Sequence, residues 1–401
     1  MITGMGIWSC LGTTLEAVCD ALRTGKSGIV FSQERKEAGF RSALCAQVPR
    51  PSLKGIIARN LRQFMPEEAE YAYMATKAAL EAAGINDDLI NKEEVGIIYG
   101  NDSVAEATMR ALDKFREFKD TAACGSGSIF QSMNSTVTMN LACLFKLRGI
   151  NLTASAACAS GSHAVGLGWL LIRNGLQDCV VCGGAQEANA YGVAAFDGIQ
   201  SFSTREDEPT KASRPFDRDR DGLVPGGGAA TLILESYDHA VRRGAPIIAE
   251  IVGWGFSGNG NHISTPNVEG PVRSLELCLK NSNVNPADIG YINAHATSTH
   301  IGDIREAQAI AKVFGSRTVP VTSTKSQTGH EMWMAGASEL IYSILMMKND
   351  FIAGNINFEN PDEDTAALLV VPETREAHFN MFLSNSFGFG GTNSTLVVKN
   401  L

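Results

Sequence analysis

Short apolar runs rich in β-branched residues alternate with amphipathic stretches along the whole chain. Residues 93–102 form one such run, which ends in polar residues and follows a helix predicted over 68–84. Residues 287–299 repeat this order behind a helix predicted over 270–283. Because apolar strands between amphipathic helices are typical of buried sheets, the pattern predicts an α/β protein.

The two helix–strand units occupy similar positions in two halves of the chain. Each half also opens on a comparable apolar strand, within residues 2–12 and 249–260, ahead of a helical region. Two matches in the same order indicate an internal duplication whose halves meet near residues 240–250. No segment has the composition of a flexible linker, so we expect one compact body. The charged stretch 203–222 is predicted to be an ordered surface loop.

Composition and charge narrow the class of protein. The 401 residues are 44% hydrophobic and 19% charged, which is typical of a globular chain. With 34 Lys and Arg against 43 Asp and Glu, the formal net charge is −9, which argues against binding to nucleic acid or an anionic membrane. No apolar run reaches the roughly 18 residues of a membrane span, and the N-terminus lacks a basic signal region. Nine scattered cysteines do not suggest a disulfide framework, so we expect a cytoplasmic protein.

The first candidate site surrounds Cys158, which stands between an apolar strand and a helix predicted through Leu171. Free backbone N–H groups and the helix dipole at such a turn favour a thiolate, and the small neighbouring residues leave room for a thioester. By contrast, Cys179 and Cys182 fall within a buried strand, where residues three apart point to opposite faces. We therefore interpret their CxxC spacing as structural.

Three further polar segments follow predicted strands. Residues 293–306 contain His295, and residues 323–339 contain Lys325 and His330. His330 follows a glycine at a predicted helix start, where the dipole favours the neutral imidazole. Residues 382–398 interleave Phe with Gly, and such a segment can bend sharply and offer backbone N–H groups to an oxyanion. Of the other histidines, His163 is predicted to pack in a helix. His239, His262 and His378 are predicted to lie exposed or in loops.

In chain order, the four segments read SAACASGSHA, NAHATST, TKSQTGH and NSFGFGGTN. Together they resemble the β-ketoacyl-[acyl carrier protein] synthases of types I and II, over residues 2–398. The phrases FSQERKEAGFRS and RDGLVPGGGAA look like the type I branch. The resemblance implies a thiolase-like, duplicated αβαβα layered fold with mixed five-stranded sheets. Residues 1–245 would carry the nucleophilic cysteine, and residues 246–401 would carry two catalytic histidines.

The resemblance also implies the chemistry. Cys158 would take an acyl chain from pantetheine, and His295 and His330 would promote decarboxylation of the malonyl carrier and hold the enolate. The carbanion would then attack the acyl-cysteine and lengthen the chain by two carbons. Neutral imidazoles suit this reaction, because an enolate oxygen needs hydrogen-bond donors. The expected partners are an acyl carrier protein and a second copy of the chain. No cofactor is expected, because the carrier brings the phosphopantetheine.

Further residues match family positions. Lys325 would set the local electrostatics near His330, with Glu306 as its acidic partner. The other matches are the backbone N–H groups of Cys158 and Phe389 for the oxyanion hole, Thr297 and Thr299 for the pantetheine arm, and Phe196, Phe387 and Phe389 for the acyl pocket. No metal is required, but Asn293, Glu339, Ser384 and Asn385 match a monovalent cation site of some members.

The chain departs from the family pattern at three places. Ala296 replaces a usual glycine, and Trp333-Met334 stand where Gly and Ala are common. Asn101-Asp102 replace part of a Gly-rich segment and are expected to give the pocket a polar edge. No catalytic group is lost, but the added volume of Trp333 and Met334 bears on the preferred chain length.

Three functions are therefore open. The main one is an elongating enzyme of dissociated fatty-acid synthesis, and the second is a ketosynthase of a specialised polyene or polyketide pathway, which would share every catalytic residue. A non-catalytic partner subunit is disfavoured because Cys158, His295 and His330 are all present. A degradative thiolase would need a second reactive cysteine near the C-terminus, and none follows Cys278. A carrier protein is acidic, so we expect a cationic docking surface. Its candidates are Arg59, Arg62, Lys114, Arg116 and Lys119.

Overall fold

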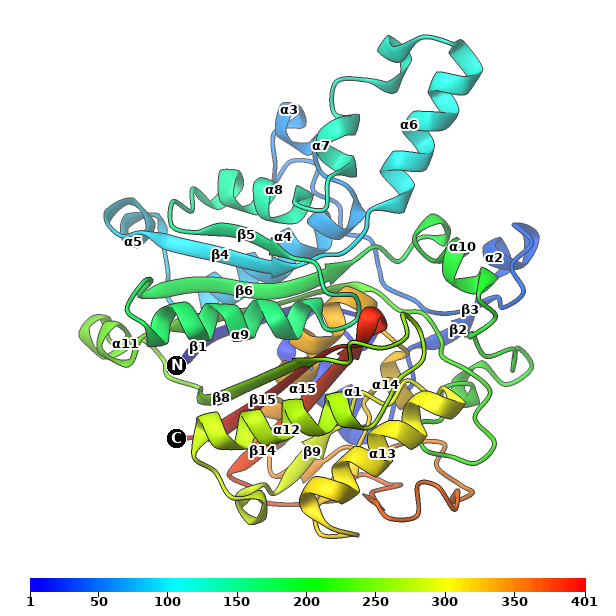
Figure 1. Ribbon diagram of the computed structural model, residues 1–401. Helices are drawn as coiled ribbons and strands as arrows, with labels where there is room; N and C mark the ends of the chain where they lie inside the picture. The colour runs from blue at the N-terminus through cyan, green and yellow to red at the C-terminus, as the bar shows by residue number, and fades with distance from the viewer.

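The computed structural model describes residues 1–401, and its strands fall into two sets of five (Figure 1). In spatial order, the first set is β5 (Asn151–Ala154), β4 (Val95–Gly100), β6 (Cys179–Gln186), β7 (Gly228–Glu235) and β1 (Ile2–Trp8). The second set is β10 (Pro320–Thr322), β9 (Tyr291–Asn293), β14 (Met381–Gly388), β15 (Thr392–Asn400) and β8 (Ala249–Gly258). Numbered by chain order within its own half, each set has the arrangement 3-2-4-5-1 with the same parallel and antiparallel pairs. The two halves thus share one topology, which is what an internal duplication predicts.

The two sets form one continuous sheet rather than two separate ones. The strands β1 and β8 pair only at Ile2 and Ala249, and the Ile248 N–H donates to the Ile2 carbonyl at 2.8 Å. A further short strand, β12 (Leu369–Val370), extends the second set beside β10, so the sheet has eleven strands. The first strand of each half lies at the inner edge of its set, which is why the two sets meet there.

Helices cover the strands in layers. Between the two sets lie α9 (Ser160–Arg173) and α15 (Ala335–Lys348), which contact each other and strands of both sets. On the outside, α4 (Glu67–Ala82) packs on β1 and β7, and α12 (Glu269–Ser282) packs on β8 and β15. All residues of α15 from Ala335 to Met347 are buried, as expected of a helix enclosed on every side. The layered αβαβα fold expected from the sequence is confirmed.

The remaining elements surround this body. The helices α6 (Ala105–Phe118), α7 (Ser128–Ser132) and α3 (Arg59–Arg62) project together from one end of the molecule, above α8 (Thr136–Phe145) (Figure 1). None of the helices combines the length and the apolar composition that a membrane crossing requires. The other elements are α1 (Leu15–Thr24), α2 (Gln33–Glu37), α5 (Asp87–Lys92), α10 (Ala190–Gly198), α11 (Tyr237–Arg243), α13 (His300–Phe314), α14 (Lys325–Thr328), the ribbon of β2 (Ile29–Phe31) and β3 (Leu44–Ala46), and the ribbon of β11 (Phe351–Ile352) and β13 (Arg375–Glu376).

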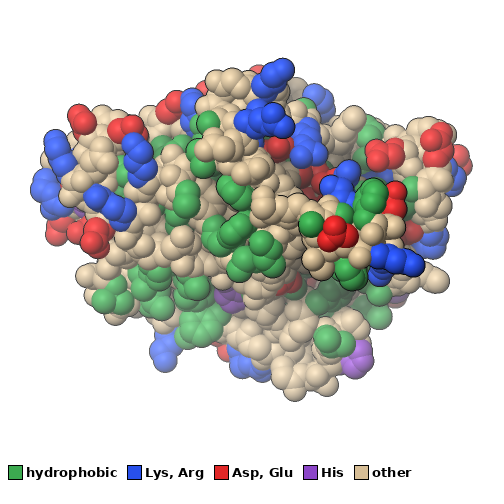
Figure 2. Space-filling model, turned by 90° about the horizontal axis from the view of Figure 1, so that it is seen from above, with side chains coloured by type: hydrophobic (Ala, Val, Ile, Leu, Met, Phe, Trp, Pro, Cys, Tyr) green, Lys and Arg blue, Asp and Glu red, His purple; other side chains and the backbone are tan.

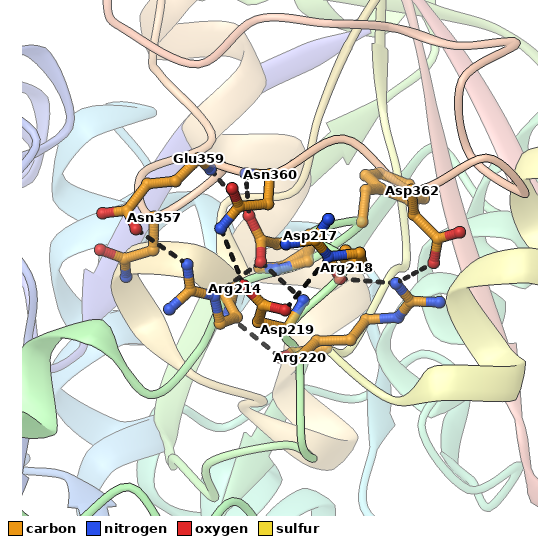
Figure 3. A network of polar contacts seen from close by, with 12 residues as sticks. Arg214, Asp217, Arg218, Asp219, Arg220, Asn357, Glu359, Asn360 and Asp362 are labelled. Atoms are coloured by element: carbon orange, nitrogen blue, oxygen red, sulfur yellow. Dashed lines mark hydrogen bonds and ion pairs between the residues drawn. The ribbon is translucent and has the colours of Figure 1, made fainter.

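The charged stretch 203–222 is not the surface loop that its composition predicts. Arg214 and Arg220 are buried and bind the loop around residues 357–362 (Figure 3). Arg214 Nε donates to Asp217 at 3.0 Å, and Arg220 Nη1 donates to Asp362 at 2.8 Å. The other oxygen of Asp217 accepts the backbone N–H groups of residues 359 and 360, each at 2.7 Å. These charges are buried because each one has a partner from a segment distant in sequence.

Candidate active site

Cys158 lies at a tight elbow between β5 and α9. Ala157 adopts a left-handed conformation with φ of 45°. The Ser160 hydroxyl closes the turn, because it accepts the Ala156 N–H at 2.8 Å and donates to the Ala157 carbonyl at 2.6 Å. Gly100 at the end of β4 lets the strand pack on α9, since a Cβ there would lie 2.4 Å from the Gly161 nitrogen. This packing buries Cys158, which is 6% exposed.

The sulfur of Cys158 is a thiol at neutral pH. Burial raises the pKa of Cys158 to about 12, against the opposing effects of the Lys325 ammonium and the backbone N–H groups of Cys158 and Phe389. The prediction of a thiolate at the helix start is therefore wrong, because desolvation outweighs those N–H groups. The structure nevertheless directs both of them at the sulfur, which is the pair assigned to the oxyanion hole from the sequence.

Two histidines face the sulfur. His295 follows β9 and His330 follows α14, yet the Cys158 sulfur and a nitrogen of each ring lie within 4.8 Å of one another. The ring centroids of the two histidines are 5.3 Å apart, and the rings are nearly perpendicular at 85°. Both nitrogens of His330, and Nδ1 of His295, make no hydrogen bond within the protein. These nitrogens are therefore free to bind a substrate.

Both imidazoles are neutral. Burial, and then the positive charge of Lys325, hold the pKa of His295 and of His330 well below the ordinary value. The neutral His330 expected from the sequence is present, but its main cause is burial rather than a helix dipole. His330 is followed by a 3₁₀ turn over Met332–Met334, and α15 begins only at Ala335.

The acidic partner of Lys325 is Glu339, not Glu306 as the sequence resemblance implied. The Lys325 ammonium donates to the Glu339 carboxylate, and both side chains are buried. Glu306 instead accepts the backbone N–H groups of His295 at 2.9 Å and Ala296 at 2.7 Å, and the Asn385 amide at 3.0 Å. Glu306 therefore fixes the loop that carries His295.

A cavity of about 440 Å³ connects these groups. Thr297 and Thr299 lie on its wall with their hydroxyl oxygens 3.0 Å apart. The phenylalanines Phe196, Phe387 and Phe389 also line the cavity, as do Arg220 and Met332. The sequence named the threonines and phenylalanines. Arg220 and Met332 lie within quoted segments but were assigned no role there, and the loop 262–267 follows no motif; all of these reach the cavity only through the fold.

Trp333 and Met334, which are neighbours in the sequence, lie in different surroundings. Trp333 belongs to a small apolar cluster with Cys158, Phe202 and Met332, and its ring centroid is 5.9 Å from that of Phe196. Phe196 in turn stacks on Phe389, with centroids 6.4 Å apart and an angle of 14°.

Met334 belongs to the main core between the layers. Only Trp333 therefore adds its volume beside the nucleophile. The expected polar pocket edge at Asn101 and Asp102 is wrong, since neither residue lines the cavity. The Asn101 amide instead donates to the Asn134 carbonyl at 2.9 Å.

The four residues of the predicted cation site are buried on β9, β14 and α15: Asn293, Ser384, Asn385 and Glu339. The Ser384 hydroxyl and one carboxylate oxygen of Glu339 make no hydrogen bond within the protein. Such oxygen atoms are suitable ligands for a monovalent cation, and the site stays a prediction.

The five predicted docking residues lie on the projecting end of the molecule. Arg59 and Arg62 belong to α3, Lys114 and Arg116 to α6, and Lys119 ends α6 in a left-handed conformation. All are exposed except Arg62, which is half-buried and donates its Nε to the Ile57 carbonyl at 3.0 Å. Figure 2 looks onto this end and shows Lys and Arg side chains beside apolar ones.

Two other histidines are engaged in the structure. His163 packs in α9 as expected, against Trp254 and with its Nε2 2.8 Å from the Thr392 hydroxyl. His239 is buried between the carboxylates of Glu235 and Glu93, so the prediction of an exposed residue is wrong. The two carboxylates satisfy both ring nitrogens, which is why burial is tolerated there.

Comparison with known proteins agrees with this geometry. Residues 1–240 match the model of the β-ketoacyl synthase N-terminal domain, and residues 248–359 match that of its C-terminal domain. The chain belongs to the β-ketoacyl synthase family. It is 41% identical over 403 residues to 3-oxoacyl-[acyl-carrier-protein] synthase 1 of Haemophilus influenzae, covering 100% of this chain and 98% of that one. The identity to the Escherichia coli K12 synthase 1 is 39% over 404 residues, with the same coverage.

Solved structures of other ketosynthases share the fold. A β-ketoacyl synthase from Burkholderia phymatum STM815 superposes with a TM-score of 0.96 at 36% identity, covering 100% of this chain and 98% of that one. The ishigamide ketosynthase/chain length factor gives 0.91 at 29% identity, with the same coverage. The family assignment made from the four sequence segments is confirmed.

Proposed function

We propose that the protein is a 3-oxoacyl-[acyl-carrier-protein] synthase that elongates acyl chains by decarboxylative condensation. The observation that carries this proposal is the cluster of one thiol and two neutral imidazoles within 4.8 Å of one another. It stands in a chain that matches, over its full length, relatives named 3-oxoacyl-[acyl-carrier-protein] synthase 1. The enzyme needs no cofactor of its own, because the carrier brings the phosphopantetheine.

The first step is acyl transfer. The Cys158 sulfur attacks the thioester of an acyl-pantetheine, and the N–H groups of Cys158 and Phe389 stabilise the oxyanion of the tetrahedral intermediate. The bond from the acyl carbon to the pantetheine sulfur breaks, and the thiol proton passes to that leaving sulfur. Because the pKa of Cys158 is raised to about 12, the proton leaves as the new bond forms rather than beforehand.

The second step uses the histidines. The carboxylate of malonyl-carrier leaves as carbon dioxide, and the N–H groups of His295 and His330 hold the enolate oxygen that results. The carbanion attacks the Cys158 thioester, the carbon–sulfur bond breaks, and the released sulfur takes up one proton from water, which restores the thiol. Neutral imidazoles serve here because the enolate forms only as carbon dioxide departs, and donors aimed at that position stabilise the transition state.

Other residues position these groups. Glu306 holds the His295 loop through its hydrogen bonds to the backbone. Burial keeps both histidines neutral, and the charge of Lys325, which is paired with Glu339, adds to that effect. Thr297 and Thr299 would bind the pantetheine arm on the cavity wall. The nucleophile comes from residues 1–245 and the histidines from residues 246–401, a division supported by the repeated strand order.

The proposal includes two partners and a location. An acyl carrier protein would dock at Arg59, Arg62, Lys114, Arg116 and Lys119. A second copy would pair along β5, the free edge of the sheet, where Leu152 is exposed together with apolar residues of α6 such as Leu112 and Phe118. An unpaired edge with apolar surroundings is the type of surface that a partner strand covers. The likeness to 3-oxoacyl-carrier synthases supports a cytoplasmic location.

A second candidate is a ketosynthase of a specialised polyene or polyketide pathway. One observation favours it: Trp333 stands beside the nucleophile where the family commonly has a small residue. A non-catalytic partner subunit is disfavoured, because the complete Cys–His–His cluster is assembled.

The test is condensation of acyl-carrier with malonyl-carrier by Cys158→Ala, with Cys143→Ala as a matched control at an exposed cysteine. We expect no elongation by the first variant and wild-type elongation by the second. Elongation by Cys158→Ala at the wild-type rate would overturn the proposal. Mass spectrometry of the chain trapped on Cys158 from a mixture of acyl-carriers separates the two candidate functions, since a saturated or singly unsaturated chain favours the first and a polyene or unreduced polyketide chain the second.

A further inference from the structure

Asp102 lies directly beside the elbow that carries Cys158. Its carboxylate accepts a hydrogen bond from the Ser155 hydroxyl and faces the backbone N–H of Ala157. The backbone brings it there, because the preceding residue, Asn101, donates its N–H to the Ala154 carbonyl at 3.1 Å. The carboxylate thus contacts the segment 155–157 at two points immediately before the nucleophile.

This segment needs support, because Ala157 has φ of 45°. The left-handed conformation is unfavourable for a residue with a Cβ and persists only where neighbouring groups hold it. Ser160 holds the carbonyl of Ala157 from the helix side at 2.6 Å. Asp102 faces the N–H of the same residue, so the two side chains hold both polar groups of the strained residue.

Asp102 also acts on the sulfur through its charge. The negative charge raises the pKa of Cys158, whereas the positive charge of Lys325 lowers it. The other titratable groups that face the sulfur are His295 and His330, and both are neutral. Burial is the main cause of the raised pKa of Cys158, and Asp102 and Lys325 are the two charges that act on it in opposite directions.

We infer that Asp102 is a positioning residue that fixes the strained elbow of Cys158. The inference rests on the proposed role of Cys158 as nucleophile. It explains a departure from the family pattern that the cavity does not explain, since Asp102 lines no part of the acyl pocket. Fixing the elbow keeps the Cys158 N–H aimed at the site where the oxyanion forms.

The experiment compares Asp102→Asn, Asp102→Ala and the control Asp87→Asn, which removes one charge from a side chain that is 84% exposed. The first measurement is the rate of Cys158 alkylation by iodoacetamide between pH 7 and 9, followed by mass spectrometry. Asp102→Asn removes one charge that raises the pKa of Cys158, so the alkylation rate should rise above the wild-type rate at each pH. Asp87→Asn should alkylate at the wild-type rate.

The second measurement is condensation. Asp102→Ala also loses the contacts to the elbow, so its kcat should fall about tenfold while the KM for acyl-carrier stays within about twofold. Thermal unfolding of Asp102→Asn confirms that the isosteric variant is folded. Wild-type kcat in Asp102→Ala would overturn the inference, and wild-type alkylation by Asp102→Asn would overturn the effect of its charge on Cys158. Failure of the wild-type enzyme to form an acyl-Cys158 would instead overturn the proposed function, so the two failures are distinguishable.

Discussion

Trp333→Ala should shift the enzyme toward longer acyl chains. Trp333 is 4% exposed and packs in the apolar cluster that contains Cys158. Truncation to Ala frees roughly 140 Å³, and at about 24 cal/mol for each Å³ of unrelaxed cavity the unliganded protein should lose about 3 kcal/mol of stability. The new space would open within the apolar cluster that contains Cys158, next to the Phe196 ring on the cavity wall, so an acyl chain bound to the sulfur could extend into it.

A longer chain can fill that space. Burial of each methylene contributes about 0.8 kcal/mol of stabilisation, so roughly four additional carbons would offset the cost of the cavity. The preferred substrate should therefore lengthen by about four carbons. The assay is turnover across a ladder of acyl-carrier lengths, together with the thermal stability of each variant in its free and acylated forms.

Met334→Ala is the matched control. Met334 is also fully buried, but it packs in the main core, close to Gly228 rather than to Cys158. It should lose about 2–5 kcal/mol of stability without any change in preferred length. If Trp333→Ala keeps the wild-type chain-length preference, or if Met334→Ala changes that preference, the volume next to the sulfur does not set the chain length.

Three further predictions concern charged groups. Lys119→Glu should raise the KM for acyl-carrier several-fold at low salt, and the effect should be smaller in added salt. Unchanged kinetics would remove this residue from the docking surface. Arg62→Glu should raise the KM in the same way and also lose stability, because the Arg62 Nε donates to the Ile57 carbonyl. Arg220→Ala should lose about 3–5 kcal/mol in urea unfolding and raise the KM for acyl-carrier, since it leaves Asp362 buried without its cationic partner and frees the carbonyls of Thr299 and His300 on the cavity wall; unchanged unfolding would contradict this.

The third concerns Glu331, whose pKa burial raises to about 8, so its protonated form is favoured in the folded state. That contribution to stability is complete below about pH 4.5 and is lost as the pH rises to about 8, so Glu331→Gln should gain several degrees in melting temperature relative to the wild type between pH 5 and pH 8. A difference in melting temperature that stays constant across this pH range would show that burial does not raise the pKa of Glu331.

Much of the fold could be predicted from the sequence, because its signals are local. Amphipathic periodicity over 68–84 and 270–283 predicted α4 and α12 within two residues. The apolar run over 93–102 predicted β4, and the repeated order of elements indicated the duplication that the strand arrangement shows. Strand β9 is shorter than its run, because the polar residues after Asn293 leave the sheet to form the histidine loop.

The candidate site followed from the sequence only in part. Cys158, His295 and His330 each follow a strand or turn with a recognisable motif. The parallel pair β9 and β10 brings the two histidine segments to one edge of the sheet, whereas Cys158 follows β5 in the other set and meets them only through the fold. The partner of Lys325 had no such signal. Glu339 reaches it because α15 passes beside α14 in the folded core, whereas Glu306 is held by the backbone of its own loop.

Burial was the property that only the tertiary structure decided. The sequence placed Cys158 at a helix start, but the surrounding layers remove water from the sulfur, and desolvation then determines its protonation state. The same holds for the charged stretch 203–222: Arg214 and Arg220 look like surface residues until the 357–362 loop brings them carboxylates. Trp333 and Met334 are neighbours in the sequence, but Trp333 packs in the cluster that contains Cys158 and Met334 packs in the main core. The 3₁₀ turn that carries them sends their side chains in different directions. Local sequence patterns determine which groups are present, and tertiary packing determines which groups each of them contacts.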